Sequence, residues 1–466
     1  MREMRPRHIV LFIASCLVLL GAICTAYEFA RPVFGDLRWK PISTFIPLDT
    51  IHSADSVPQQ PIRRPRPEPV VWLNDSSELL AEVEAEEKVE AEKATPETKV
   101  VPDTLPAVKP SAGALDAFIA GLQEAGTRQV RVVHYGDSQI EEDRITATIR
   151  RQLQALYGGG GPGILPLYQT IPTRTVRQSL TVNGKTASMK TAPQRYLVYG
   201  PKSQQRDSNN YGPMGQVALM DTLLKAGTDN LVMRVEPNGK LTSANHFNQV
   251  RLLKTAGVEV NARSGNILSL PEGSSECTLE FTGQGEVYGV SLETETGVIV
   301  DNIPMRGGSG NVFTKISEAQ LRQFFRETNT RLIILQFGGN VMPWADTPER
   351  VRGYANSMRR QIRYLQACAP NASILFVGPS DMTTVIEGEK TTYPMLPQMD
   401  RQLAKMAASE GIAYWSLYEA MGGWNSMQAW NEKGLAATDG VHFSQRGADK
   451  AGGLLWQWLE KKIGQK

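Results

Sequence analysis

The stretch Gln129-Val-Arg-Val-Val-His-Tyr-Gly-Asp-Ser138 decides the fold. Its first seven residues, 129–135, are rich in β-branched and aromatic side chains, which predicts a strand. Gly136 ends that strand. Apolar residues then recur at helical spacing, at Ile145, Ile149, Leu153 and Leu156. A strand that leads at once into a helix is the repeating unit of an α/β domain, and we expect its first part to cover residues 111–164.

The same alternation resumes in residues 295–466. Strands are predicted at 297–303, 331–337, 373–377 and 412–417, and helices at 317–327, 348–367, 395–409 and 447–462. Near-continuous apolar strands that alternate with amphipathic helices indicate a parallel sheet covered on both faces. We therefore predict a three-layer α/β/α domain.

Between these two parts, in residues 165–294, the pattern changes. Short β-type runs are predicted at 230–235, 247–254, 258–262, 276–282 and 286–293. Turn segments such as Pro237-Asn-Gly239 separate them. This region is predicted to be a β-sandwich insert of jelly-roll-like type.

The N-terminal segment, residues 1–27, carries Arg2, Arg5 and Arg7 before an apolar run. That run, ~18 residues long, is just long enough to span a bilayer as a helix. The arginines favour the cytoplasmic side, so the rest of the chain is expected across the membrane. Cleavage of a signal peptide near Cys24-Thr-Ala26 is the competing interpretation.

Residues 28–110 are rich in proline and lack sustained periodicity. A Glu, Ala and Lys-rich stretch at 78–99 adds little apolar surface, so we predict a largely disordered linker. Such a linker lets a catalytic domain reach away from the membrane. Disorder without a specific role is the alternative.

Composition gives no reason to propose nucleic acid as a partner. The formal net charge is +2, and no polybasic run follows the apolar segment. The five histidines are scattered, so we expect no metal ion and no other cofactor. Cys277 and Cys368 are far apart, and two buried thiols are favoured over one disulfide.

The segment Gly136-Asp137-Ser138 follows a strand and is expected to open a helix. In a parallel sheet, ligands bind at the carboxyl ends of strands. Free backbone N–H groups at a helix N-terminus there can stabilise an oxyanion. We expect Glu141, Glu142 and Asp143 to favour the helix dipole. For this motif alone, a simple N-cap serine is the favoured interpretation.

Asp439-Gly-Val-His442 precedes the last predicted helix. A three-residue spacing can place the carboxylate against one imidazole nitrogen while the other nitrogen faces a nucleophile. A capping aspartate beside a packed histidine is the alternative.

Two further turns follow strands. Gly338-Gly-Asn340 ends the strand 331–337, and an asparagine amide can donate a hydrogen bond to an oxyanion there. Arg306-Gly-Gly-Ser-Gly310 follows the strand 297–303, where glycine lets a backbone N–H approach a carbonyl oxygen. Ordinary turns are the alternative for both segments.

Together, these four segments resemble the SGNH/GDSL hydrolase family in their order along the chain. The resemblance covers roughly 111–164 and 295–466. It implies Ser138 as nucleophile, His442 as base and Asp439 as its orienting acid. It also implies an oxyanion hole made by Ser138, Gly307 and Asn340, with Gly308 as an alternative to Gly307. Asn340 is followed by Val341 instead of the acidic residue often found in the family.

The β-rich insert resembles the arrangement in bacterial peptidoglycan O-acetylesterases, which carry a carbohydrate-binding-like module there. The resemblance implies an exported serine esterase that removes O-acyl groups, with O-acetyl expected, from a cell-envelope glycan such as peptidoglycan. A glycan O-acetyltransferase with the same triad is the close alternative, and a catalytically silent glycan-binding protein is the alternative from another class.

The implied location is the bacterial periplasm, with the N-terminal helix in the inner membrane, or outside the cell after cleavage. The expected partners are the O-acylated glycan and that membrane, and a membrane acyltransferase is left open as a third.

Three other features of the sequence could belong to a functional site. The glycine-rich segment 158–163 lacks the Gly-Lys-Ser/Thr ending of a phosphate loop and is predicted to be a loop at the rim of the site. Trp415, Trp424 and Trp430 precede the Asp-x-x-His segment and could stack on sugar rings, although packing is favoured for Trp415. His134 is predicted to be structural.

Overall fold

The computed structural model of the chain describes residues 113–220, 230–239 and 242–464. The predicted membrane helix (1–27) and linker (28–110) lie outside the described residues. Within the described ranges, no helix combines the length and the apolar character needed to cross a membrane.

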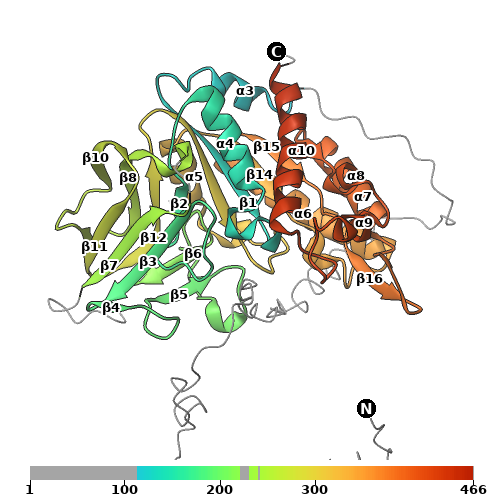
Figure 1. The fold of residues 1–466 in the computed structure, drawn as a ribbon, viewed down its shortest axis with the longest axis horizontal. Helices are drawn as coiled ribbons and strands as arrows, with labels where there is room; N and C mark the ends of the chain where they lie inside the picture. Colours follow the sequence, from blue (N-terminus) through green and yellow to red (C-terminus); the bar gives the residue numbers. More distant parts are fainter. Residues whose placement is uncertain (1–112, 221–229, 240–241, 465–466) are drawn as a thin grey trace, which may run out of the picture. The chain divides into compact units, whose positions relative to one another are not determined.

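A five-stranded sheet with the strand order β13-β1-β14-β15-β18 forms the centre of the described chain (Figure 1). Its strands are β1 (Gln129–Gly136), β13 (Gly297–Pro304), β14 (Thr330–Gln336), β15 (Ser373–Val377) and β18 (Ala413–Trp415). Every neighbouring pair is parallel, so the carboxyl ends of all five strands share one edge. This confirms the predicted parallel sheet.

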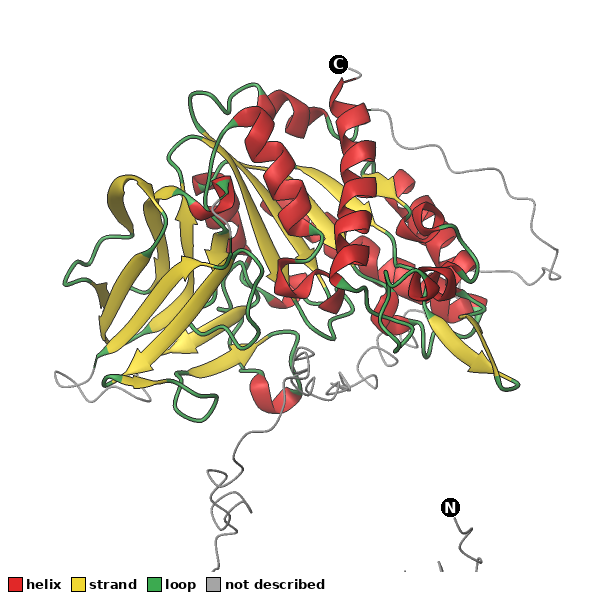
Figure 2. Ribbon diagram, viewed as in Figure 1, coloured by secondary structure: helices red, strands yellow, loops and turns green. Residues whose placement is uncertain are grey.

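Helices cover both faces of this sheet (Figure 2). They are α3 (Asp116–Leu122), α4 (Thr146–Tyr157), α5 (Glu318–Glu327), α6 (Pro348–Cys368), α7 (Leu396–Ser409), α8 (Leu417–Met421), α9 (Ser426–Glu432) and α10 (Gln445–Gly464). Successive side chains of a strand point to opposite faces. Thus Ile333 and Leu335 of β14 pack in a cluster with α5, α6 and α7. Leu332 and Ile334 pack in a second cluster with α3, α4 and α10.

The region between the two parts of this domain is antiparallel, as predicted. One sheet contains β2 (Gly163–Leu165), β5 (Gln194–Leu197), β6 (Gln216–Leu219), β8 (Phe247–Lys254), β10 (Ile267–Ser274) and β12 (Glu286–Glu293). The other contains β3 (Val176–Val182), β4 (Lys185–Thr186), β7 (Leu231–Pro237), β9 (Val258–Val260) and β11 (Cys277–Gly283). Apolar side chains from both sheets meet in a third buried cluster. Cys277 and Cys368 are both free and buried, as predicted.

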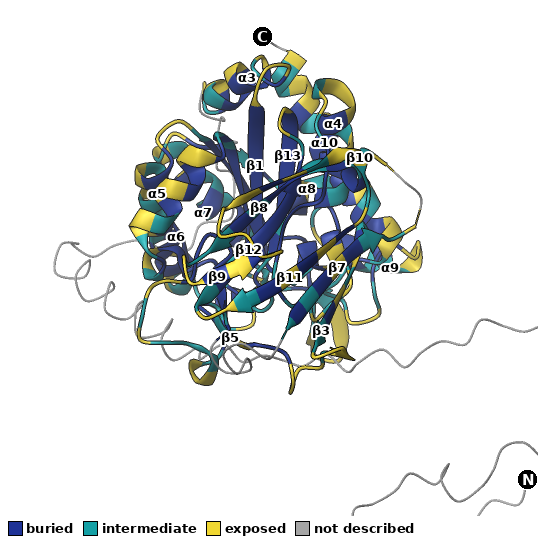
Figure 3. Cartoon of the chain, turned by 90° about the vertical axis from the view of Figure 1, so that its left-hand side faces the viewer, coloured by how far each residue is buried: buried dark blue, intermediate teal, exposed yellow. Residues whose placement is uncertain are grey.

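A buried cluster of charges joins the antiparallel region to the parallel sheet. All eight residues of β1 are buried (Figure 3), and among them is Arg131. Its guanidinium donates to Asp301 Oδ1 on β13 at 2.7 Å and to Glu293 on β12. Burial alone would raise the pKa of Glu293, but Arg131 and Arg251 outweigh it and hold that pKa below its usual value. The side chains of Arg131, Glu293 and Asp301 are 0% exposed, so this ion-paired group is fully desolvated.

The glycine-rich segment 158–163 does not lie at the rim of the site, so that expectation is wrong. It packs against the beginning of β13, at the end of the sheet opposite the carboxyl ends. A Cβ on Gly159 would lie 2.4 Å from the backbone nitrogen of Val298. The glycines are thus explained by close packing of backbone on backbone.

We expect Arg131→Ala to lower the free energy of unfolding by about 3–5 kcal/mol, because it leaves Asp301 buried without a cation and Glu293 with Arg251 alone. Urea denaturation measures this change. The control is Arg177→Ala, which breaks an exposed cross-strand pair with Glu236 at 3.1 Å and should cost below about 1 kcal/mol. Equal losses in the two variants would contradict the role given to the buried cluster.

Candidate active site

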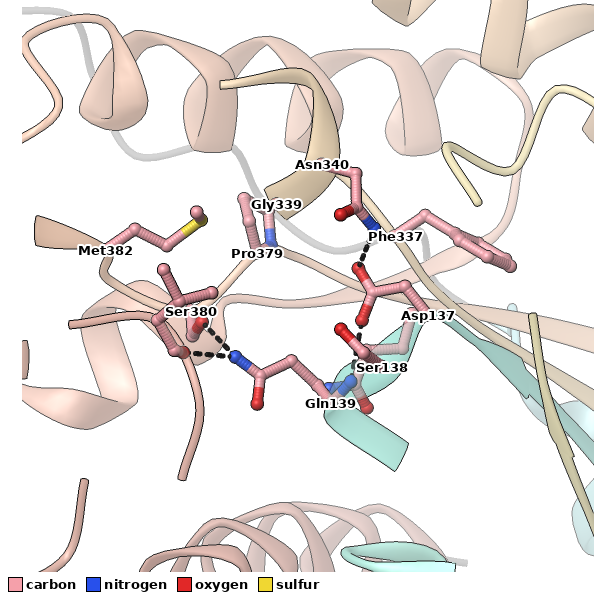
Figure 4. Close-up of a pocket in the computed structure, with 11 residues that line it drawn as sticks. Asp137, Ser138, Gln139, Phe337, Gly339, Asn340, Pro379, Ser380 and Met382 are labelled. Carbon is pink, nitrogen blue, oxygen red and sulfur yellow. Dashed lines mark hydrogen bonds between the residues drawn. The ribbon is translucent and has the colours of Figure 1, made fainter. Parts of the chain in front are cut away.

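A pocket opens where the carboxyl ends of the three central strands meet, as Figure 4 shows. It is lined by Asp137, Ser138, Gln139, Gln336, Phe337, Gly339, Asn340, Pro379, Ser380, Met382 and Val441. The first three residues follow β1, the next four end or follow β14, and the next three follow β15. The parallel sheet therefore brings three distant segments to one place.

Ser138, His442 and Asp439 form a continuous hydrogen-bonded chain at this pocket. Ser138 Oγ lies 2.8 Å from His442 Nε2, although the two residues are 304 positions apart. His442 Nδ1 lies 2.9 Å from Asp439 Oδ2. The carboxylate thus holds one ring nitrogen while the other faces the serine hydroxyl. This is the geometry in which an imidazole can remove the serine proton.

The Asp439 carboxylate is held by its own loop. Its Oδ1 accepts hydrogen bonds from the backbone N–H groups of Val441 and His442, both at 2.9 Å. Burial favours the neutral acid, but these bonds and the imidazole outweigh it, so the pKa of Asp439 lies well below its usual range. The carboxyl is therefore ionised throughout the neutral pH range.

The loop that carries His442 is also held by contacts with a neighbouring hairpin. Gly440 has a φ of +71°, and a Cβ there would lie 2.7 Å from Thr383 Cβ. Its carbonyl accepts a hydrogen bond from the Thr383 N–H at 2.8 Å. Thr383 begins the hairpin of β16 (Thr383–Ile386) and β17 (Glu389–Thr392). Only glycine allows both the left-handed turn and this close approach.

The turn after Ser138 differs from the expected helix. Residues Ser138–Asp143 form a 3-10 helix, and α4 begins only at Thr146. Asp137, not Ser138, caps it, since Asp137 Oδ1 accepts from the Gln139 N–H at 2.9 Å. The N-cap interpretation of Ser138 is therefore wrong, and its hydroxyl is available to His442.

The expected dipole role of the acidic residues after Ser138 is also not observed. Glu141 pairs with Arg306 at 3.1 Å, and Asp143 pairs with Arg150 in the interior. Glu142 and Asp143 have positive φ angles of 63° and 62°, which break a regular helix. Specific ion pairs thus decide the conformation of this turn.

Asn340 lies at the pocket, where its amide Nδ2 donates to Gly308 O at 3.1 Å and to Asp137 Oδ2 at 3.3 Å. The Gly308 N–H already donates to Met305 O at 2.8 Å, which disfavours Gly308 as an oxyanion donor. Gly307 is its chain neighbour, but it is not among the residues that line the described pocket. Burial raises the pKa of Asp137 to about 6.

Gln139, Ser380 and Met382 line the pocket, and sequence reasoning missed all three. Gln139 directly follows the nucleophile candidate, and that adjacency is the only signal that could have found it. Ser380 and Met382 follow a short strand without any motif. Their place becomes visible only when β15 is seen beside β14.

The three tryptophans named above and His134 differ in how far their side chains are buried. Trp415 and Trp430 are buried, whereas Trp424 is 50% exposed. Packing is therefore the observed role of Trp415 and Trp430. His134 is fully buried and its ring bonds to Thr146 Oγ1 at 2.9 Å. Burial lowers the pKa of His134 to about 3, so the ring is neutral and structural, as predicted.

These features define an α/β protein with the side-chain arrangement of a serine hydrolase. The model of the GDSL-like Lipase/Acylhydrolase family matches residues 269–450. This match confirms the predicted resemblance over that part of the chain. The matched segment contains Gly307, Asn340, Asp439 and His442. Ser138 precedes the matched segment, which begins within β10 of the antiparallel region.

Several solved structures are similar to this chain to different degrees. A structure titled "Peptidoglycan O-acetylesterase in action" superimposes with a TM-score of 0.58 at 21% identity, over 76% of this chain and 97% of that chain. A carbohydrate acetylesterase from Sinorhizobium meliloti gives a TM-score of 0.26 at 12% identity, over 35% of this chain and 79% of its own. The periplasmic domain of a lipopolysaccharide acetyltransferase from Salmonella ser. Paratyphi A gives 0.26 at 13% identity, over 35% and 73%. The search of curated protein sequences gave no match.

We expect Asp439→Asn to be less stable than the unsubstituted protein at neutral pH, because a carboxylate with a lowered pKa stabilises the folded state. The folded-state pKa lies below the unfolded value of about 3.9, so this contribution is complete at neutral pH. It is lost as the pH falls below about 4. Urea denaturation at stepwise lower pH measures the difference between the two proteins. A difference that stays constant into the acid range would contradict the assignment.

Proposed function

We propose that this chain is an exported serine esterase that removes O-acyl groups, with O-acetyl expected, from a cell-envelope glycan such as peptidoglycan. The observation that carries the proposal is the hydrogen-bonded chain from Ser138 through His442 to Asp439 at the carboxyl edge of the sheet. A surface that only binds glycan does not require this chain.

In the proposed reaction, Ser138 Oγ attacks the acyl carbonyl carbon while His442 Nε2 takes the hydroxyl proton. The bond from that carbon to the sugar oxygen then breaks, and His442 returns the proton to the leaving sugar hydroxyl. Water, activated by the same imidazole, hydrolyses the acyl-enzyme. Asp439 Oδ2 holds the Nδ1–H throughout and stabilises the imidazolium that forms in each step.

The oxyanion of each tetrahedral intermediate is proposed to lie among the N–H groups of Ser138 and Gly307 and the amide of Asn340. The amide contact with Asp137 is the longer of the two that Asn340 makes, at 3.3 Å against 3.1 Å. An incoming oxyanion is therefore expected to take that N–H. Donors fixed before the reaction stabilise developing charge without a cost of reorganisation.

The choice of a glycan ester rests on the comparisons and on the predicted export signal. The peptidoglycan O-acetylesterase structure superimposes along 97% of its own length, antiparallel region included, which supports an acetyl ester of a glycan as substrate. The arginines and apolar run in residues 1–27 support a periplasmic location with a membrane anchor. The antiparallel region is proposed to bind the glycan, and a membrane acyltransferase is a proposed further partner.

Ser138→Ala and His442→Ala are each expected to lower acetate release from O-acetylated peptidoglycan by about 10⁴-fold or more, because either change removes the activated nucleophile. The full-length chain is used, and acetate is measured enzymatically. Ser409→Ala, which changes an exposed serine on α7, is the control and should keep full activity. Turnover like that of the unsubstituted protein in either triad variant would sink the mechanism.

An assay with an added glycan acceptor distinguishes hydrolysis of the acyl-enzyme from transfer of its acyl group to a sugar. If the acyl group passes from the enzyme to a sugar hydroxyl faster than to water, the protein is an acetyltransferase that uses the same triad.

Asn340→Ala is expected to lower kcat by about 10²–10³-fold with little change in KM, because the amide acts on the oxyanion and not on the bound ester. Steady-state kinetics on a soluble acetyl ester separate the two parameters. An effect confined to KM would remove Asn340 from the proposed oxyanion hole.

A further inference from the structure

The peptide carbonyls on both sides of His442 are held by side chains from the turn that carries Ser138. Gln139 Nε2 donates to Val441 O at 2.6 Å. Arg144 Nη1 donates to Phe443 O at 3.3 Å. The residue before the base and the residue after it are thus both tied to the segment that follows β1.

The same two side chains reach other parts of the site. Gln139 Nε2 also donates to Ser380 Oγ at 3.2 Å, and Figure 4 shows its amide pointing toward the Ser380 segment. Arg144 Nη2 donates to the carbonyl of Ser138 itself at 2.9 Å. Its Nε donates to Glu141 O at 2.9 Å, which leaves the guanidinium bonded in three directions. Three loops are therefore linked through two side chains.

The two side chains that make these contacts are buried, whereas the His442 side chain is not. Gln139 and Arg144 are only 7% and 9% exposed. The side chains of His442 and Asp439 are 30% and 40% exposed, and they lie in the loop between α9 and α10. Water competes for hydrogen bonds in an exposed loop, so its position depends on the buried bonds at its flanks.

We propose that Gln139 and Arg144 are positioning residues that hold the His442 loop at hydrogen-bond distance from Ser138. This inference rests on the proposed function. Among the described residues, the hydrogen bonds of these side chains go to other atoms than Ser138 Oγ and His442 Nε2: the Gln139 amide donates to two protein acceptors, and the Arg144 guanidinium donates to three carbonyls. They act through the backbone on either side of the base. A shift of about 1 Å in such a group can cost about 10²-fold in rate.

Gln139→Met keeps the length of the side chain and removes the donor. We expect kcat for acetyl ester cleavage to fall by about 10–100-fold with KM unchanged. The matched control is Gln154→Met. Gln154 is 3% exposed and donates to two carbonyls, Gly161 O and Val298 O, both at 3.3 Å and away from the pocket. This control should lose stability but keep kcat.

Gln139→Glu gives a signature that a merely structural role would not produce. An ionised carboxylate cannot donate to Val441 O, and two acceptors would face each other, whereas a protonated carboxyl can donate. The ratio of variant to unsubstituted kcat should therefore rise as the pH falls from about 8 to about 5.

Arg144→Lys keeps the positive charge but cannot serve three carbonyls from one planar group. It is expected to lower kcat with KM unchanged, as Gln139→Met does.

Different results separate this inference from the proposed function. If the unsubstituted chain releases no acetate from glycan or from a soluble ester, the proposed function fails and this inference fails with it. If that chain is active, full kcat in Gln139→Met, a change in KM alone, or a flat pH ratio for Gln139→Glu overturns the positioning role. Should Gln139→Met not fold, the pH ratio of Gln139→Glu and the kinetics of Arg144→Lys still decide.

Discussion

The position of β1 between β13 and β14 is the constraint on which the rest of the structure depends. Its parallel pairing on both sides fixes where β1 ends, and Gly136 lies level with Gln336 and Pro304. Ser138 therefore lies beside the turn that carries Asn340 and within hydrogen-bond distance of His442. The register of β1 thus brings together side chains from segments up to 304 residues apart.

A sequence insertion between β1 and β13 could loosen this register, and the buried charges explain why it does not. Arg131 on β1 binds carboxylates on β13 and on β12, the last strand of the antiparallel region. Removing Arg131 would leave Asp301 buried without a cation and Glu293 with Arg251 alone. The antiparallel region is consequently part of the same packed structure as the sheet that forms the site, and not an appendage.

Most of the fold could be predicted because the spacing of apolar residues along the chain reflects which side chains are buried. The strands around 131, 333 and 375 are continuous runs of apolar residues, and the helices show one apolar face. Ser138, His442 and Asp439 could be singled out because motif spacing matched chain order, and the structure brings their side chains together. What could not be predicted depends on contacts across the chain. The kinked turn after Ser138 follows from the Arg150 and Arg306 ion pairs, and Gln139 and Ser380 meet only in the folded protein. The glycine segment 158–163 was misplaced because its packing partner, the beginning of β13, is remote in sequence.

The central claim is that Ser138 is an activated nucleophile. The most direct measurement is covalent labelling of the full-length chain with a fluorophosphonate, followed by mass spectrometry of the labelled peptide. The account predicts one adduct, on Ser138, that forms much more slowly after His442→Ala. A folded chain that forms no adduct on Ser138, or that labels equally fast after His442→Ala, would contradict it.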